Sequence, residues 1–484
     1  MEFEIEQTRI NSDIFDKQQF LKQIDIIKEA SELAQAKIDY ASAHDDNIIR
    51  AIDVVEEFLR KKHRLCYGGQ AINAHLPNKY KFYNPEFSIP DYDFFTPNHE
   101  SDISALVKDL KKAGFTEISV REGMHDGTIK IYVDYIPVAD MTQIDPKLYR
   151  ILSKREFRTD GISYLDANSL RMLMYLELSR PKGEVSRWPK VYERLLLFNE
   201  FVPTKQCRLS RRTLRGGLTQ DQTSYTITFI IENKRIFAGA DLLEFYSHTD
   251  RANKQPYHSK KHNISWLISS KNPIIFFSPD INSDSKILRE EFNFLLNESK
   301  QSHNDISAAP KKQITIKTYA SRGADLIPSM KVITQKNKSL VFIIDQTACH
   351  SYLNIPLLDN KIMRIASMDT LISLYFSLGL FDSKFYNMGS MECLANNLVK
   401  ISIKSRKEGK DSITFPFISI KCSGHQTSLP SLIRAKVQRI TQKKYQLKNI
   451  LVDKSKSKSK SKSINKLRNT VKNKNKNILR GDID

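Results

Sequence analysis

The sequence predicts an α+β protein, in which a lobe with a mixed β-sheet and flanking helices is followed by a second lobe of related build. The chain has 484 residues, which is too long for one compact core. Helical and strand-like segments succeed one another between residues 64 and 218. After about Leu218 this pattern partly starts again. We therefore expect two or three domains.

The N-terminal residues 1–63 are predicted to be helical. Asp45 and Asp46 can cap a helix whose apolar residues Ile48, Ile52 and Val55 share one face. A short strand at 65–67 then leads into Gly68-Gly69 and a helix-like segment.

The rest of the first lobe follows from local patterns. A strand is expected at 91–95, a helix at 101–113, and a hairpin at 128–143 with its turn near Asp134-Tyr135. Residues 168–200 are helical, with a break at 179–183.

The second lobe is expected to repeat part of this plan. TITFIIENKRIFAGADLLEFY, from Thr226, predicts a strand, then Gly239, then a helix. Further strands are predicted at 273–278, 313–318 and 340–345, with a helix at 366–379. Because this lobe lacks a Gly-Gly pair and an Asp-x-Asp strand, we expect it to carry no metal site. The predicted divisions are 1–63, 64–218, 219–453 and 454–484.

The net charge of +21 favours a polyanionic partner. Residues 454–484 contain eleven Lys and Arg and two Asp, so nine of these charges lie there and twelve in the remainder. The alternation of Lys with Ser and Asn cannot form an apolar face, so this tail is predicted to be disordered.

Membrane, secreted and metal-binding cysteine classes are disfavoured. No apolar run is long enough to span a bilayer, and the N-terminus does not resemble a secretory signal. The five cysteines form no CxxC pair, which disfavours a zinc site or a disulfide framework and points to a reducing compartment.

The candidate chemistry lies in three carboxylates. Asp91 and Asp93 are expected on one face of a strand, about 7 Å apart, because residues i and i+2 point the same way. Adjacent carboxylates repel unless a cation lies between them, and Mg²⁺ prefers oxygen ligands. Asp140 on the returning arm of the hairpin would complete a two-metal site. Asp134 is its rival, although Asp is common in turns.

Gly68 and Gly69 predict a phosphate-binding turn. Between a strand and a helix, glycines let the backbone approach a phosphate closely, and the helix N-terminus offers free N–H groups.

These motifs together resemble the nucleotidyltransferase superfamily with the DNA polymerase beta-like palm. Within it the chain most resembles the poly(A) polymerase catalytic subunits of poxviruses and giant DNA viruses. The resemblance is carried by YGGQAIN, PDYDFF, HDGTIKIYVDYIPVADMT and SLRMLMYLELSRPKGEVSRWPKVYERL, over about residues 65–200. The gap from Gly69 to Asp91 is longer than usual in the superfamily.

The resemblance implies a template-independent polymerase that adds AMP from ATP to messenger RNA 3′ ends. Gly68 and Gly69 would contact the triphosphate, and Asp91, Asp93 and Asp140 would bind Mg²⁺, with Mn²⁺ possible. It also implies a degenerate nucleotidyltransferase-like second lobe, and a location in the virion and host cytoplasm. Arg187 and Lys190 are candidates for binding nucleotide phosphates or RNA, or are surface charges beside Trp188. A homodimer without a membrane partner is expected.

Two alternatives stay open. One is another terminal nucleotidyltransferase or an oligonucleotide synthase. The other is a non-catalytic RNA-binding subunit with a decayed site, which would gain support if one of the carboxylates were buried in a salt bridge.

Overall fold

The computed structural model describes residues 17–84, 86–87, 89–207, 217–249, 268, 272–301, 314–323, 326–336, 338–381, 388–407 and 419–446. They fall into two compact units. The first joins Met1–Arg121 with Gly127–Thr427, and the second joins Glu122–Asp126 with Ser428–Asp484. The predicted disordered tail, 454–484, lies outside the described residues.

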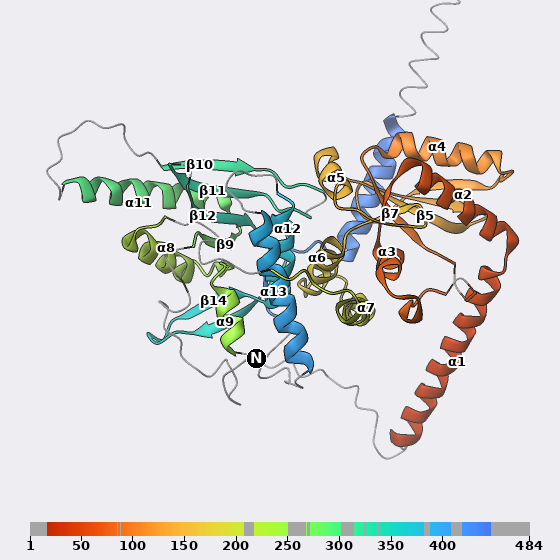
Figure 1. The fold of residues 1–484 in the computed structure, drawn as a ribbon, viewed down its shortest axis with the longest axis horizontal. Coiled ribbons are helices and arrows are strands. Elements are labelled where there is room, and N and C mark those ends of the chain that lie inside the picture. The colour runs from red at the N-terminus through yellow and green to blue at the C-terminus, as the bar shows by residue number, and fades with distance from the viewer. Residues whose placement is uncertain are drawn as a thin grey trace, which may run out of the picture. The chain divides into compact units, whose positions relative to one another are not determined.

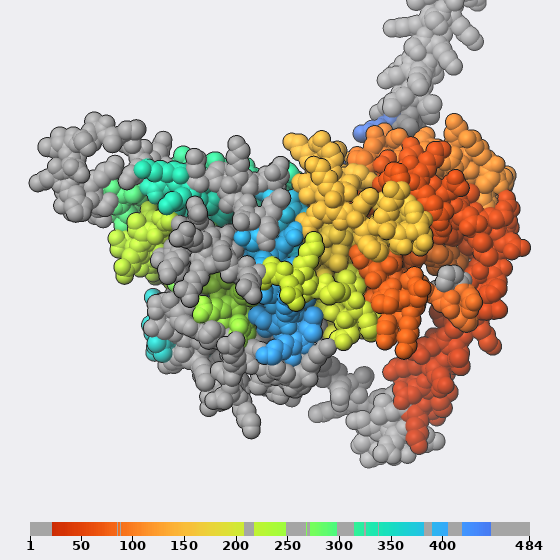
Figure 2. All heavy atoms as spheres, in the orientation of Figure 1, coloured from red at the N-terminus to blue at the C-terminus, as the bar shows by residue number. Residues whose placement is uncertain are grey.

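Two helices precede the first sheet, as predicted. Helix α1 spans Lys17–Ala43, and α2 spans Asp46–Lys62 with Asp45 as its N-cap. The Asp45 carboxylate accepts from the N–H groups of Asn47 and Ile48, which would otherwise be unpaired. Helix α2 buries the predicted apolar face. Every side chain of α1 from 22 to 38 is exposed (Figure 2).

The first sheet has seven strands in the order β3-β4-β5-β2-β1-β7-β6; β5 and β7 are labelled in Figure 1. Strands β2 and β5 are parallel, and β4 and β5 form the predicted hairpin. The strands are β1 Leu65–Tyr67, β2 Tyr92–Thr96, β3 Ile118–Glu122, β4 Thr128–Val133, β5 Ile136–Gln143, β6 Phe157–Thr159 and β7 Ile162–Tyr164.

The helices of this lobe also agree with the sequence patterns. The predicted break at 179–183 separates α6 from α7. The helices are α3 Gly68–His75, α4 His99–Lys112, α5 Pro146–Ser153, α6 Ala167–Leu178 and α7 Trp188–Phe201, with short 3-10 turns at Asn78–Tyr80 and Val185–Arg187.

The second sheet has eight strands in the order β10-β11-β12-β9-β8-β14-β13-β15. From its second to its seventh position, this sheet repeats the pairing directions of the first sheet, through the central parallel pair to the far hairpin. The predicted internal repeat is therefore a repeat of topology. The strands are β8 Ile236–Phe237, β9 Ile274–Ser278, β10 Ile314–Tyr319, β11 Met330–Gln335, β12 Lys338–Asp345, β13 His350–Pro356, β14 Ile362–Ala366 and β15 Cys422–Ser423.

One buried ion pair recurs in both lobes. Arg64, just before β1, donates from Nε and Nη2 to Asp102 on α4, at 2.6 and 2.9 Å. Arg235, just before β8, donates from the same two nitrogens to Asp284 on α11, at 2.8 and 2.9 Å. The shared pair ties the start of each central strand to the helix that covers it.

The predicted order of a strand, then Gly239, then a helix is confirmed by β8 and by α9, Leu242–Thr249, but the strand is shorter than expected. The residues from Thr226 to Glu232 lie in α8, Gln220–Glu232. Thr219 and Gln222 form a capping box, which favours a helix and was missed in favour of the β-branched residues that follow. The other helices of this lobe are α9 Leu242–Thr249, α11 Ile281–Gln301, α12 Met368–Gly379 and α13 Met388–Lys407. Helices α6 and α12 pack together between the sheets (Figure 1).

The expectation that disulfides are disfavoured was wrong. Cys207 is bonded to Cys393, and Cys349 to Cys422. Both bonds join residues far apart in sequence, so motif spacing could not reveal them. Cys66 is free and buried in β1.

The second unit contains a basic helix at residues 429–446. Its Arg439 lies 3.5 Å from Asp126 and donates to the carbonyl of Met124, while Lys443 forms an ion pair with Glu122. Opposite charges thus hold the helix against residues 122–126. In the described part of the chain, no helix has the length and apolar character needed to cross a bilayer.

Candidate active site

The three predicted carboxylates lie on two neighbouring strands. Asp93 on β2 is the register partner of Asp140 on β5, so the two residues lie side by side in a parallel ladder. Asp91 comes one residue before β2 and shares the face of Asp93 by the alternation of an extended chain. The fold therefore brings together the residues that the sequence separates by almost fifty positions.

Alternation along β2 fixes the direction of these side chains. Tyr92 and Phe94 are almost completely buried, and the Phe94 ring lies 6.0 Å from the ring of Phe58 on α2. Since successive side chains of a strand point to opposite faces, the core packing of these two rings holds Asp93 on the other face.

The cluster carries negative charge that the protein only partly neutralises. Burial raises the pKa of Asp93 to about 7, with further contributions from Asp91 and Asp140. The pKa of Asp91 is also raised, first by loss of hydration and then by Asp140. Carboxylates held together against their own repulsion are suited to a divalent cation, so the donor set fits Mg²⁺ or Mn²⁺.

Lys130 on β4 is in direct contact with this cluster. It is the register partner of Asp140 and forms an ion pair and hydrogen bond with Asp140 Oδ2. Asp140 is buried and forms a salt bridge, which is the arrangement that would favour the alternative of a non-catalytic RNA-binding subunit. Within the described ranges, no three His, Cys, Asp or Glu side chains are arranged to hold a metal ion.

The rival carboxylate, Asp134, lies at the hairpin turn. Asp134 and Tyr135 have φ angles of 48° and 67°, the left-handed conformation that such a turn needs. Asp134 thus has a local structural reason to be there.

Each glycine makes room for a specific side chain. Gly68 has a φ of +73°, and a Cβ placed there would lie 2.4 Å from Asp93 Oδ2. A Cβ on Gly69 would lie 2.6 Å from the Tyr83 hydroxyl and 2.8 Å from Arg194 Nη1. Helix α3 begins at Gly68 without a side-chain cap, so its first N–H groups are available to an anion.

Positive charge approaches the carboxylates from α7. Lys190 and Arg194 lie four residues apart on one face of α7, and Arg187 is the residue just before this helix. Lys190 and Arg194 both lower the pKa of Asp91, and Arg187 lowers that of Asp93. Arg187 is also 3.2 Å from Glu177 and 3.7 Å from Glu184, so its charge is shared.

Arg194 is the residue that sequence reasoning missed. Its Nη2 donates to the Tyr83 hydroxyl at 2.8 Å, and its guanidinium lies over the rings of Phe82 and Tyr83. The N–H groups of Phe82 and Tyr83 in turn donate to Asn73 Oδ1 on α3. The long segment between Gly69 and Asp91 thus returns to the glycine turn. The helical spacing from Lys190 was the available signal.

The second lobe has apolar residues at the equivalent positions. When Arg235 is matched with Arg64, Gly239 aligns with Gly68. Ile275, whose carbonyl accepts a hydrogen bond from the Ala238 N–H, then aligns with Asp93. Ile275 pairs with Phe342, as Asp93 pairs with Asp140, and Phe342 pairs with Val332, as Asp140 pairs with Lys130. Within the described residues, the paired carboxylates Asp93 and Asp140 therefore have no counterpart at the equivalent positions of the second lobe.

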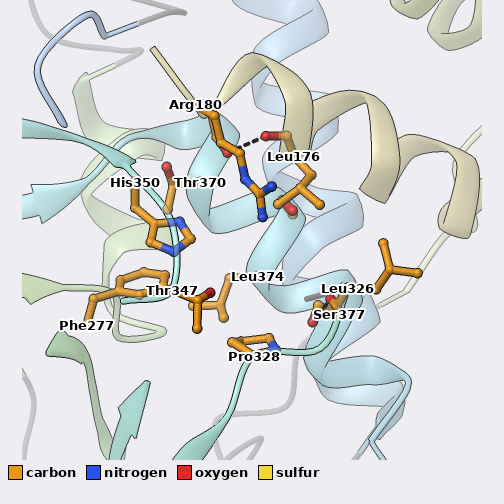
Figure 3. A pocket seen from close by; sticks show the side chains of 12 residues that line it. Leu176, Arg180, Phe277, Leu326, Pro328, Thr347, His350, Thr370, Leu374 and Ser377 are labelled. Atoms are coloured by element: carbon orange, nitrogen blue, oxygen red, sulfur yellow. Dashed lines mark hydrogen bonds between the residues drawn. The ribbon is translucent and has the colours of Figure 1, made fainter. Parts of the chain in front are cut away.

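A small cavity lies apart from the carboxylates, where α6 approaches the second sheet (Figure 3). Arg180 and His350 both line it, and burial together with Arg180 lowers the pKa of His350 to about 3. The imidazole is therefore neutral. The cavity volume of about 20 Å³ suits one or two water molecules.

Comparisons with known proteins agree with this geometry. Residues 53–184 match the model of the family described as "Poly(A) polymerase catalytic subunit". The predicted resemblance is confirmed over this segment. It contains the glycine turn, all three carboxylates and Lys130.

Curated relatives extend the match only slightly. Over 157 residues the chain is 29% identical to a "Putative poly(A) polymerase catalytic subunit" of African swine fever virus (strain Badajoz 1971 Vero-adapted), covering 32% of this chain and 33% of that protein. A protein of the same name from Acanthamoeba polyphaga mimivirus is 26% identical over 179 residues, or 35% of this chain and 29% of the relative. The matches span about a third of the length of these relatives.

A solved structure matches over much more of the chain. The Megavirus polyadenylate synthase aligns with a TM-score of 0.65 and 17% identity, covering 90% of this chain and 84% of that one. The chain therefore has the α+β nucleotidyltransferase fold of that structure, and the prediction of the fold class is confirmed.

Proposed function

We propose that this protein is a template-independent polynucleotide adenylyltransferase, which adds AMP from ATP to the 3′ ends of messenger RNA. The names of its viral relatives support this activity over residues 53–184. The reaction joins the 3′-oxygen of the RNA to the α-phosphorus of ATP, and pyrophosphate leaves.

The observation that carries the proposal is the pairing of Asp93 with Asp140 beside Asp91. Decay of an enzyme into a binding subunit removes the need for such a costly cluster, and the second lobe has Ile275 and Phe342 at the positions of Asp93 and Asp140. Lys130 supplies only one positive charge to three carboxylates. This difference between two lobes of one topology favours catalysis over the decayed alternative.

The chain's own residues would position the triphosphate. The uncapped N-terminus of α3 at Gly68 and Gly69 would bind phosphate oxygens through backbone N–H groups. Lys190 and Arg194 would add positive charge from α7, and Arg187 would contribute after exchanging Glu177 for a phosphate. Positioning and charge neutralisation dominate this class of reaction.

Asp91, Asp93 and Asp140 would hold two Mg²⁺ ions, with Mn²⁺ as a substitute. When bound, these ions would lower the pKa of the RNA 3′-hydroxyl and neutralise the triphosphate and the leaving pyrophosphate. The protein's contribution is to hold the three carboxylates on rigid paired strands, with Gly68 leaving room for Asp93.

RNA is the proposed polymer partner, and the net charge of +21 supports it. We also propose that the protein forms a homodimer, because the chain carries its own excess of basic residues; light scattering tests this. We propose the location in the virion and host cytoplasm that the resemblance implies; fractionation of infected cells tests it. The domain limits 1–63, 64–218, 219–453 and 454–484 likewise remain proposals.

The direct test is incubation of the pure protein with 5′-labelled RNA that has a free 3′-hydroxyl, with Mg²⁺ and each nucleoside triphosphate separately. Extension with ATP above the other three is the expected result. Equal use of all four would favour another terminal nucleotidyltransferase, and RNA binding without extension would favour the non-catalytic subunit.

A further inference from the structure

Lys130 has a position that no structural need of the fold explains. It lies at the centre of β4, where Ile129, Ile131 and Val133 point into the core and Lys130 points to the carboxylate face. The equivalent position in the second lobe, Val332, is completely buried and apolar. The same ladder thus forms with or without a cation there.

The charge of Lys130 is directed at the candidate metal ligands. It forms an ion pair with Asp140, and its charge also acts on Asp91 and Asp93. The Asp140 side chain is 13% exposed and that of Lys130 37%. The carboxylate is therefore fixed in the sheet, while the longer and more exposed lysine can move away from it.

We propose that Lys130 is an internal counter-ion that occupies Asp140 in the free enzyme and competes with divalent cations for this carboxylate. The inference rests on the proposed function, because it takes Asp140 as a metal ligand. Lys130 is a positioning residue in this account. Its competition would keep the affinity of the free site for divalent cations low. When a nucleotide binds, Lys130 would release Asp140, and the nucleotide phosphates would complete the cation site.

Competition makes a different prediction from a structural role. Removing the charge should strengthen cation binding, because Asp140 then has no internal partner, and repulsion of the incoming ion also falls. A structural ion pair would instead leave cation affinity unchanged or weaken it as Asp140 lost its alignment.

The test is the affinity of the full-length protein for Mn²⁺ alone, measured by electron paramagnetic resonance without RNA or nucleotide. Lys130→Gln and Lys130→Met should each bind Mn²⁺ about fivefold more tightly than the wild type, as the strength of a partly exposed ion pair implies. Lys130→Arg keeps the charge and the pair, so its affinity should stay within about twofold of the wild-type value.

Lys190→Gln separates competition for Asp140 from general repulsion. Lys190 carries the same charge near Asp91 but has no ion pair with Asp140, so its loss should change Mn²⁺ affinity by less than about twofold. Unchanged or weaker binding in both Lys130 variants would overturn the inference, as would an equal gain in Lys190→Gln. Failure of the wild type to extend RNA would contradict the proposed function instead, since the Mn²⁺ titration involves no catalysis.

Discussion

Asp93 and Asp140 are register partners on parallel strands, and the positive charge near Asp93 does not offset its burial and the repulsion from Asp91 and Asp140. Burial and the two other carboxylates raise the pKa of Asp93 to about 7. The fold therefore maintains an electrostatic cost where β2 and β5 pair. Changes at this site should therefore alter the stability of the protein as well as its activity.

Stability without divalent cations should fall as the pH rises. Between about pH 4 and pH 7 the folded protein keeps a proton on Asp93 that the unfolded chain has lost, so the folded state is favoured at the acid end. In Asp93→Asn this contribution is absent. Urea unfolding in EDTA at pH 5 and pH 8 should show a smaller loss of unfolding free energy in the variant. An identical pH dependence would mean that Asp93 ionises normally.

Gly68→Ala should abolish nucleotide addition, whereas Gly114→Ala should not. Both glycines have positive φ angles, +73° and +95°, so each substitution costs about 1 kcal/mol of backbone strain. Only at Gly68 does the new methyl group meet another atom, Asp93 Oδ2 at 2.4 Å, while Gly114 faces open space. The extension assay and thermal melts of both variants measure the difference. Equal activities would show that Gly68 does not set the position of Asp93.

Tyr83→Phe should raise the KM for ATP about tenfold with a smaller effect on kcat. The substitution removes the hydroxyl that accepts a hydrogen bond from Arg194, and a hydrogen bond to a charged group contributes about 1.5–3 kcal/mol. Arg194 would then be poorly held beside Gly69. Tyr135→Phe, in the exposed hairpin turn, is the matched control. An unchanged KM in Tyr83→Phe would exclude Arg194 from the triphosphate site.

The repeated ion pair predicts equal structural importance in the two lobes. Arg64→Met and Arg235→Met each leave a buried carboxylate without its bidentate partner, which should cost about 3 kcal/mol or more. Arg60→Met breaks the more exposed pair with Glu56 and should cost less than about 1 kcal/mol. Urea unfolding compares the three. A small loss in only one of the buried pairs would show that the topological equivalence does not extend to energetics.

Much of the first lobe could be predicted because its signals are local. The alternation of β2, the left-handed turn at Asp134 and the Asp45 cap each depend on neighbouring residues, and all are found in the structure. The choice of Asp140 over Asp134 followed from the same hairpin register. The roles of these residues in metal and nucleotide binding stay predictions.

The remaining features depend on contacts between distant segments. The ion pair of Lys130 with Asp140 depends on the pairing of β4 with β5. The contact of Arg194 with Tyr83 depends on the loop at Tyr83 folding back on α3. The disulfides join Cys207 to Cys393 and Cys349 to Cys422 without any spacing signal. Helix α8 was missed because β-branched residues outweighed a capping box that decided the structure.

The central claim is that Asp91, Asp93 and Asp140 catalyse nucleotide addition together, and the most direct measurement is RNA extension with ATP and Mg²⁺ by single variants. Asp91→Ala, Asp93→Ala and Asp140→Asn should each lose at least about 100- to 1,000-fold in rate, the effect expected when one charge-stabilising group is removed from such a site. Asp134→Asn should retain nearly full activity, because Asn also adopts the left-handed turn at that position. All four should keep the wild-type circular dichroism spectrum. Activity retained in both Asp91→Ala and Asp93→Ala, or a greater loss in Asp134→Asn than in Asp140→Asn, would contradict the account.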